Sequence, residues 1–273
     1  MSSATPAAVA TPPVNAVIHS RIRTVRAEGL GVITLARPEK KNALDRETAV
    51  ELVAALHELE NADDVRVVII EGDGDDFCAG ADLAALGAQM DDGVEAHIED
   101  ARALGRVFST IRGMSKPSVA IVRGRALAGG AGLATACDIV LAEESAQFGY
   151  PEVRIGFVPA MVMTMLRRAV GEKRAAELVL TGRTIFAPEA ERIGLISRSI
   201  PTAAFPAEVA RTIEALVRAP RTALGLTKQL LYRMDDLDFS QSIRVGVATN
   251  VESRATDDFR EGVQRFLNRA ANG

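Results

Sequence analysis

Two uninterrupted apolar runs constrain the fold of this 273-residue chain most strongly. The first is VRVVIIEG, from Val65 to Gly72, and the second is PSVAIVRG, which begins at Pro117. Neither run alternates apolar with polar residues, and both contain β-branched residues, so each predicts a strand buried on both faces. A long helical pattern, DDGVEAHIEDARALGRVFSTIRGM, separates them. Because such strands need helices to cover them, the sequence predicts an α/β fold.

The remaining patterns extend this alternation of strands and helices. VIHSRIRTVRAEGLGVITLARP predicts two strands joined around Glu28–Gly31, and LDRETAVELVAALHELENA predicts a helix capped by Asp45. DIVLA, after Asp138, predicts another strand. Beyond Val158 the patterns become helical. From Pro201 onward only helical patterns remain, at about 206–218, 222–233, 239–253 and 257–269.

Composition excludes several classes of function. Acidic and basic residues are evenly mixed at a net charge of −4, so a nucleic-acid partner is not indicated. No apolar run approaches the length of a membrane span. Two cysteines and three scattered histidines, His19, His57 and His97, cannot form a disulfide framework or a spaced metal site, and they fit a reduced, cytoplasmic setting. Residues 1–16 are small, uncharged and proline-bearing, which predicts a disordered tail.

The glycine-rich stretch ALAGGAGLATACD, from Ala126 to Asp138, is an unusual way to begin a helix. It is not a phosphate-binding loop, because Gly130 and Ala131 occupy the positions of the lysine and hydroxyl residue, and it is not a dinucleotide loop. It fits a strand-to-helix turn whose amides point at a substrate oxygen. It equally fits close packing of a helix on a strand without any chemistry.

A second turn of small residues favours the chemical alternative. DDFCAGADL, from Asp75 to Leu83, again follows a buried strand and precedes a helix. One amide from each turn could bind a single carbonyl oxygen, which would make an oxyanion hole from backbone alone.

With these two turns, the sequence resembles the crotonase superfamily, the enoyl-CoA hydratase/isomerase family. The matching stretches are ITLARPEKKNAL, VVIIEGDGDDFCAGADL, KPSVAIVRGRALAGGAGLATACDIVLAEESAQFGYPEVRIGFVPA, AAELVLTGRTIFAPEAERIGLI and SRATDDFREGVQRFL. The resemblance implies a spiral of β-β-α turns over residues 17–200 and a helical trimerisation region over 201–273. It also implies a homotrimer or homohexamer that binds acyl-CoA and needs no cofactor, since coenzyme A is part of the substrate.

The resemblance also assigns site residues. The oxyanion amides would be those of Ala81 and Gly129, and the proton carrier would be Glu152. Residues expected to contact the CoA or acyl group are Lys41, Asn42, Ala43, Cys78, Ala79, Asp82, Gly130, Gly132, Tyr150 and Arg154. On an extended segment Tyr150, Glu152 and Arg154 would share one face. Met161, Val162 and Met163 could line the acyl pocket or pack in the core.

Gly132 departs from the family pattern, which often places a second glutamate there. Two carboxylates would divide the proton transfers of hydration, whereas double-bond migration needs only one base. However, FGYPEVRIGFVPAMV resembles methylglutaconyl-CoA hydratases and their close relatives, which also have glycine at this position. The sequence therefore favours an enoyl-CoA hydratase, with a double-bond isomerase or a non-catalytic acyl-CoA-binding protein as alternatives. Asp138 is expected to cap or pair locally instead of replacing the missing acid.

Overall fold

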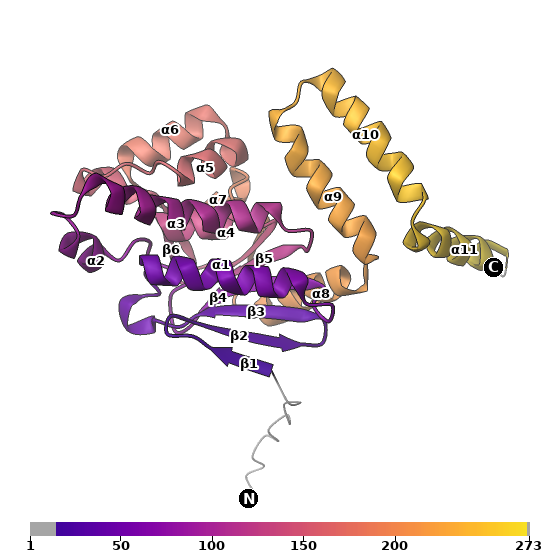
Figure 1. Ribbon diagram of the computed structural model, residues 1–273, viewed down its shortest axis with the longest axis horizontal. Helices are drawn as coiled ribbons and strands as arrows, with labels where there is room; N and C mark the ends of the chain where they lie inside the picture. Colours follow the sequence, from indigo (N-terminus) through magenta and orange to yellow (C-terminus); the bar gives the residue numbers. More distant parts are fainter. Residues whose placement is uncertain (1–14, 272–273) are drawn as a thin grey trace, which may run out of the picture.

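The computed structural model describes residues 15–271 and contains two sheets surrounded by helices (Figure 1). The seven strands of the large sheet lie in the order β1-β2-β3-β4-β5-β7-β10, and those from β3 onward are parallel. They are β1 (Asn15–Ile18), β2 (Ile22–Ala27), β3 (Leu30–Leu35), β4 (Val67–Gly72), β5 (Ser118–Val122), β7 (Ile139–Glu143) and β10 (Arg198–Ile200). The predicted tail ends too late, because residues 15 and 16 already pair with β2; residues 1–14 lie outside the described part.

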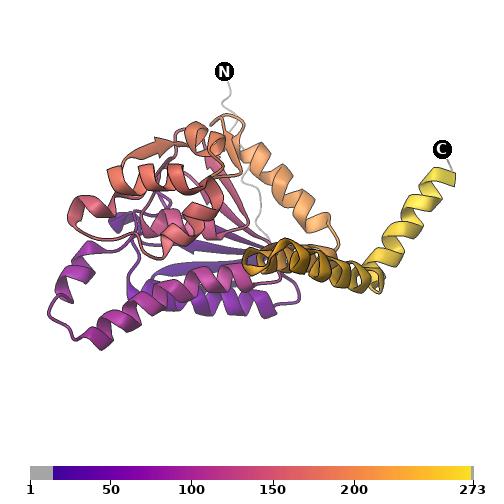
Figure 2. The same ribbon diagram turned by 90° about the horizontal axis from the view of Figure 1, so that it is seen from above.

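Strand β4 is buried on both faces, as its continuous apolar run predicts. Val68 and Ile70 pack into the larger core, under α1 (Arg46–Asn61) and α3 (Val94–Gly113). Val67 and Ile69 face the other way and pack with α8 (Phe205–Arg218). The two views show the sheet between these helices (Figure 2). Asp45 caps α1 as predicted, accepting a hydrogen bond from the Thr48 amide at 2.8 Å.

Successive turns of the chain each add a strand to both sheets. The small sheet consists of β6 (Arg125–Leu127), β8 (Gln147–Gly149) and β9 (Thr184–Phe186). Strand β5 is followed by β6 and then by α4 (Gly129–Ala136), and β7 is followed by β8 and further helices. Cys78 forms a parallel bridge to Ala126, which continues the small sheet into the preceding turn. This is the spiral of β-β-α turns that the family resemblance predicts.

The helices expected after Val158 are present, but two strands interrupt them. β9 and β10 have three residues each, too few to show an alternating pattern, so the sequence predicts neither of them. The remaining α-helices are α2 (Leu83–Ala88), α5 (Val162–Val170), α6 (Glu172–Thr181), α7 (Ala187–Arg192), α9 (Arg221–Arg233), α10 (Phe239–Arg254) and α11 (Asp257–Ala271). Short 3-10 helices lie at Pro38–Lys40, Pro151–Ile155 and Met234–Asp236. Over residues 15–271, no helix is both long and apolar enough to cross a membrane.

Helices α9 to α11 project away from the sheets (Figures 1 and 2), and a buried polar cluster attaches the first of them. The Asp138 carboxylate forms an ion pair with Lys228 Nζ at 2.8 Å and accepts a hydrogen bond from the Tyr232 hydroxyl at 2.6 Å, and both partners are on α9. It also accepts from the Ser118 amide at 2.7 Å. The expectation of a local partner for Asp138 is therefore wrong, because its partners come from β5 and α9.

Candidate active site

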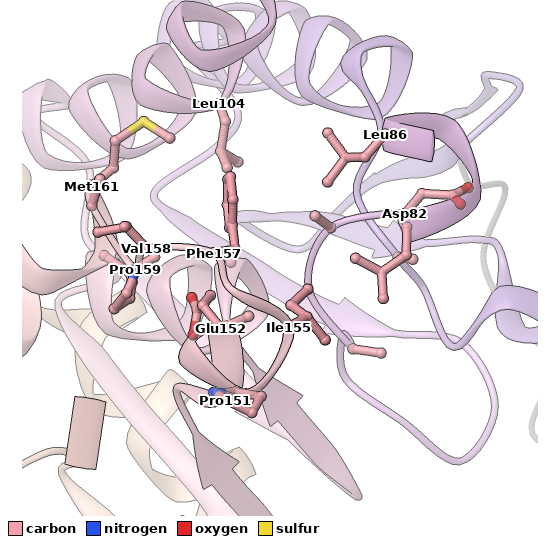
Figure 3. Close-up of a pocket in the computed structure, with 18 of the residues that line it drawn as sticks. Asp82, Leu86, Leu104, Pro151, Glu152, Ile155, Phe157, Val158, Pro159 and Met161 are labelled. Atoms are coloured by element: carbon pink, nitrogen blue, oxygen red, sulfur yellow. The ribbon is translucent and has the colours of Figure 1, made fainter. Parts of the chain in front are cut away.

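One large cavity, of about 560 Å³, brings together the two small-residue turns and Glu152 (Figure 3). Its walls come from α2, the start of α4, the 3-10 helix at Pro151–Ile155, and the following loop. Its lining residues are Lys40, Ala43, Ala79, Ala81, Asp82, Leu83, Ala84, Leu86, Leu104, Ala128, Gly129, Pro151, Glu152, Arg154, Ile155, Phe157, Val158, Pro159, Ala160, Met161 and Val162. The two predicted oxyanion residues and the predicted proton carrier therefore share one cavity.

Two glycines allow the small-residue turns to pack directly on each other. Gly80 has φ +95°, and a Cβ there would lie 2.8 Å from the Leu127 carbonyl oxygen. A Cβ on Gly130 would lie 2.2 Å from the Cys78 carbonyl oxygen. The packing explanation thus accounts for Gly80 and Gly130, and their close approach is what brings Ala81 and Gly129 to the same cavity.

The amides of Ala81 and Gly129 are available to a ligand. Neither amide donates a hydrogen bond to another atom within residues 15–271. Gly129 is the first residue of α4, so its amide carries the partial positive charge of a helix N-terminus. Ala128 before it has φ 50° and ψ −121°, a strained conformation fixed by the 2.8 Å bond from its amide to the Gly149 carbonyl. Strain of this kind is typical of residues that orient a functional group.

Glu152 lines the same cavity as these amides, with its carboxylate largely removed from water. The residue is 7% exposed, and its Oε2 atom is buried without a hydrogen-bond partner. Figure 3 shows its carboxyl group among apolar neighbours, including Pro159 and Val158. Burial raises the pKa of this carboxyl, because an apolar wall disfavours the charged form. The combination suits a group that accepts and returns a proton.

Asp82, the other carboxylate of the cavity, is fixed as an anion. It accepts from Lys40 Nζ and Arg37 Nη2, each at 2.8 Å, and caps α2 through the amides of Ala84 and Ala85. The Lys40 hydrogen bond above all lowers its pKa far below the usual range. Figure 3 shows its carboxylate turned away from Glu152. Asp82 therefore holds the turn in place and is poorly suited to carry a proton. No cluster of metal-ligating side chains occurs within residues 15–271.

The predicted shared face of Tyr150, Glu152 and Arg154 is wrong. Pro151–Ile155 forms a 3-10 helix instead of an extended segment, so residues two apart point in different directions. Tyr150 is fully buried in the core and does not line the cavity. Arg154 lines the cavity, but its Nε lies close to Gly182, 3.2 Å from where a Cβ there would be.

Several other predicted contacts lie behind the cavity wall. Asn42 is buried and donates to the carbonyl oxygens of Asp73 and Asp76 at 2.9 and 2.7 Å. Cys78 is fully buried, and burial raises the pKa of its thiol to about 12. Lys41, Gly130 and Gly132 do not line the cavity either, whereas Ala43, Ala79 and Asp82 do. The side chains of Asn42 and Cys78 therefore support the loops that position the site, and they do not line the cavity.

Most of the apolar wall of the cavity is not predicted by the sequence. It consists of Leu83, Leu86, Leu104, Ile155, Phe157, Val158 and Pro159, together with Met161 and Val162, which the sequence left open between pocket and core. Met163 packs against the core instead. The available signal was the run IGFVPAMV, whose residues Ile155, Phe157 and Val158 are all more than half exposed. Exposed apolar residues grouped in this way mark a binding surface.

The sequence and structure are similar to those of named proteins. The family model described as enoyl-CoA hydratase/isomerase matches residues 25–272. A Thermus thermophilus protein, provisionally named as an enoyl-CoA hydratase, is 41% identical over 238 residues, which cover 87% of this chain and 94% of the relative. An enoyl-CoA hydratase structure from Mycobacterium smegmatis aligns with a TM-score of 0.88 at 28% identity, covering 92% and 97% of the two chains. Human enoyl-CoA hydratase domain-containing protein 3 aligns with a TM-score of 0.86 at 28% identity, covering 91% and 98%.

Proposed function

This chain belongs to the enoyl-CoA hydratase/isomerase family, and from that premise we propose that it hydrates the enoyl group of an acyl-CoA thioester. The observation that carries the proposal is a single buried, unpartnered carboxyl, Glu152, in the same cavity as the free amides of Ala81 and Gly129. Relatives named as enoyl-CoA hydratases support water addition as the reaction.

The proposed reaction uses one carboxylate twice. The thioester oxygen accepts hydrogen bonds from the amides of Ala81 and Gly129, which draws electron density from the β carbon. Glu152 takes a proton from water while the water oxygen bonds to the β carbon, giving an enolate whose charge rests on the thioester oxygen. Glu152 then returns its proton to the α carbon and is ionised again. Atoms and charge balance without a second acid.

The cavity wall favours an uncharged, apolar acyl chain. Leu83, Leu86, Leu104 and Phe157 offer hydrocarbon surface to the part of the substrate beyond the thioester. Of the two basic residues of the cavity lining, Lys40 is paired with Asp82, and Arg154 has its Nε packed beside Gly182. Because a carboxylated acyl group such as methylglutaconyl needs a free cation or several donors when buried, we propose that an apolar 2-enoyl-CoA is the better substrate.

Double-bond isomerisation is the second candidate, and the single carboxylate favours it. Glu152 could remove a proton from carbon 2 of a 3-enoyl thioester and deliver it to carbon 4. No water takes part in this reaction, which suits a cavity with an apolar wall.

The test follows the ultraviolet absorbance of the conjugated enoyl thioester. Crotonyl-CoA, 3-methylglutaconyl-CoA and a 3-enoyl-CoA are each incubated with the protein. We expect the signal to fall with crotonyl-CoA, and faster than with 3-methylglutaconyl-CoA. An increase from the 3-enoyl-CoA, with no loss from the others, would make the protein an isomerase. Binding without any change would leave only an acyl-CoA-binding protein.

The raised pKa of Glu152 predicts the pH dependence of hydration. The carboxyl must be ionised to accept the water proton, so kcat/KM falls as the pH decreases through its pKa. Because burial raises that pKa, the acid limb should lie above the ordinary glutamate value of about 4.3. The measurement is kcat/KM for crotonyl-CoA across the acidic and neutral range. An acid limb of the kcat/KM profile at the ordinary glutamate pKa would show that Glu152 is solvated or is not the base.

We further propose that copies of the chain associate through the C-terminal helices as a trimer or a dimer of trimers. Apolar side chains on α10 and α11 are exposed, including Phe239, Val247, Val251 and Phe266. Helical faces this apolar are normally covered in solution. Sedimentation velocity should give the mass of three or six chains, and a charge at Val251 or Phe266 should reduce it. A monomer at micromolar concentration would contradict the proposal.

A further inference from the structure

Gly132 lies on α4, one turn beyond the oxyanion amide of Gly129, and has no room for a side chain. A Cβ on Gly132 would lie 2.3 Å from Cγ1 of Val162 and 3.1 Å from Cζ of Phe108. The first distance is far inside van der Waals contact. The glycine is therefore required by what packs against it and not by its backbone conformation, which is helical.

Val162 is held in this position. It is the first residue of α5, it is 4% exposed, and it lines the cavity that contains Glu152. Because Val162 is buried within the hydrophobic core, a rotation that moved its Cγ1 away would have to displace other core side chains. The α5 backbone beside it is anchored by the bond from the Met163 amide to the Pro159 carbonyl at 3.2 Å.

We propose that Val162 determines how many carboxylates act in this site, by excluding any side chain from position 132. The inference rests on the proposed hydratase function and specifies how it is carried out. Val162 presents hydrocarbon to the cavity where a carboxylate from α4 would otherwise reach the substrate. Glu152 must then perform both proton transfers. Val162 is a specificity-determining residue in this scheme and carries no proton itself.

The steric part of the proposal is tested by stability alone, with a four-member cycle of Gly132→Ala and Val162→Ala. Alanine for glycine inside a helix normally stabilises it. We expect Gly132→Ala to lower the melting temperature of the wild type and to lower it much less with Val162→Ala, which removes Cγ1 and leaves only the 3.1 Å contacts to Phe108 Cζ and to the Cβ of residue 162. Gly262→Ala, in α11 where a Cβ meets nothing within 4 Å, is the control and should shift both backgrounds equally. An equal effect of Gly132→Ala in both backgrounds would overturn the proposal, whatever the activity assays give.

The catalytic part is tested by adding the second carboxylate. Gly132→Glu alone should reduce folded protein and activity. With Val162→Ala it should fold and hydrate crotonyl-CoA about tenfold or more faster than Val162→Ala alone, at the low end of what a positioned acid or base contributes. If Gly132→Glu alone accelerates hydration, or the folded double variant gains nothing over Val162→Ala, Val162 does not control the reaction. If the stability cycle is positive but the wild type neither hydrates nor isomerises any thioester, the proposed function fails while the exclusion by Val162 stands.

Discussion

Glu152→Gln should keep acyl-CoA binding and lose nearly all turnover. The substitution preserves the size of the side chain but removes the atom that accepts the proton. A positioned acid or base contributes roughly 10²–10⁴-fold, and no other cavity carboxylate is free to replace it, since Asp82 is paired with Arg37 and Lys40. The measurement compares the variant with the wild type in two quantities, kcat for crotonyl-CoA and the dissociation constant of a saturated acyl-CoA. Turnover within a few-fold of the wild type would show that Glu152 is not the proton carrier.

The same variant should be more stable than the wild type, which a purely structural role would not predict. An ionised carboxylate without a partner is costly to bury, and glutamine removes that cost. The raised pKa in the folded state means that folding favours the protonated form. The wild type therefore loses stability as the pH rises through the interval between the unfolded and folded pKa values. The advantage of Glu152→Gln should be greatest above this interval and vanish below it. Glu58→Gln, at an exposed position on α1, is the control and should show neither effect.

Much of the fold follows from local sequence patterns. The runs around Val68 and Ser118 predict doubly buried strands because every position in them meets a core, and both strands are present. The order of the strands across the sheet did not follow from any pattern; only the family resemblance supplied the spiral. The two small-residue turns could be paired by chemical reasoning alone, since each leaves an amide free at the end of a buried strand.

The rest of the site depends on contacts between distant segments. Nothing in the sequence shows that Val162 lies against Gly132, thirty positions earlier, because the contact exists only once α5 has packed on α4. The direction of the Arg154 side chain depends on whether Pro151–Ile155 is extended or helical. Five residues are too few for the spacing of apolar residues to distinguish the two conformations. Asn42 and Cys78 belong to the family motif, yet their side chains are used to hold loops together.

Gly130→Ala should unfold or severely disable the protein, because it forces the two oxyanion turns apart. The added Cβ would lie 2.2 Å from the Cys78 carbonyl oxygen and 2.8 Å from its carbonyl carbon. These are backbone atoms of a turn whose position is fixed by the bonds from Cys78 N to Arg125 O and from Leu127 N to Cys78 O, at 2.9 and 3.0 Å. Overpacking of a tight core costs about 1–3 kcal/mol when side chains can adjust, and we expect the upper end or more here.

Separating the turns also moves the Ala81 amide away from the Gly129 amide, so any protein that folds should hydrate slowly. Removing one donor from an oxyanion hole typically costs about 10²–10³-fold in kcat. Thermal unfolding and kcat are measured together, with Gly129→Ala as the stability control, since its Cβ would make only ordinary van der Waals contacts, the shortest to Leu44 Cδ1 at 3.6 Å. The neighbouring glycines should thus differ sharply in melting temperature. If Gly130→Ala melts like Gly129→Ala and keeps wild-type turnover, the contact between the two turns does not position the oxyanion hole, and the role of the glycine stretch would have to be sought elsewhere in α4.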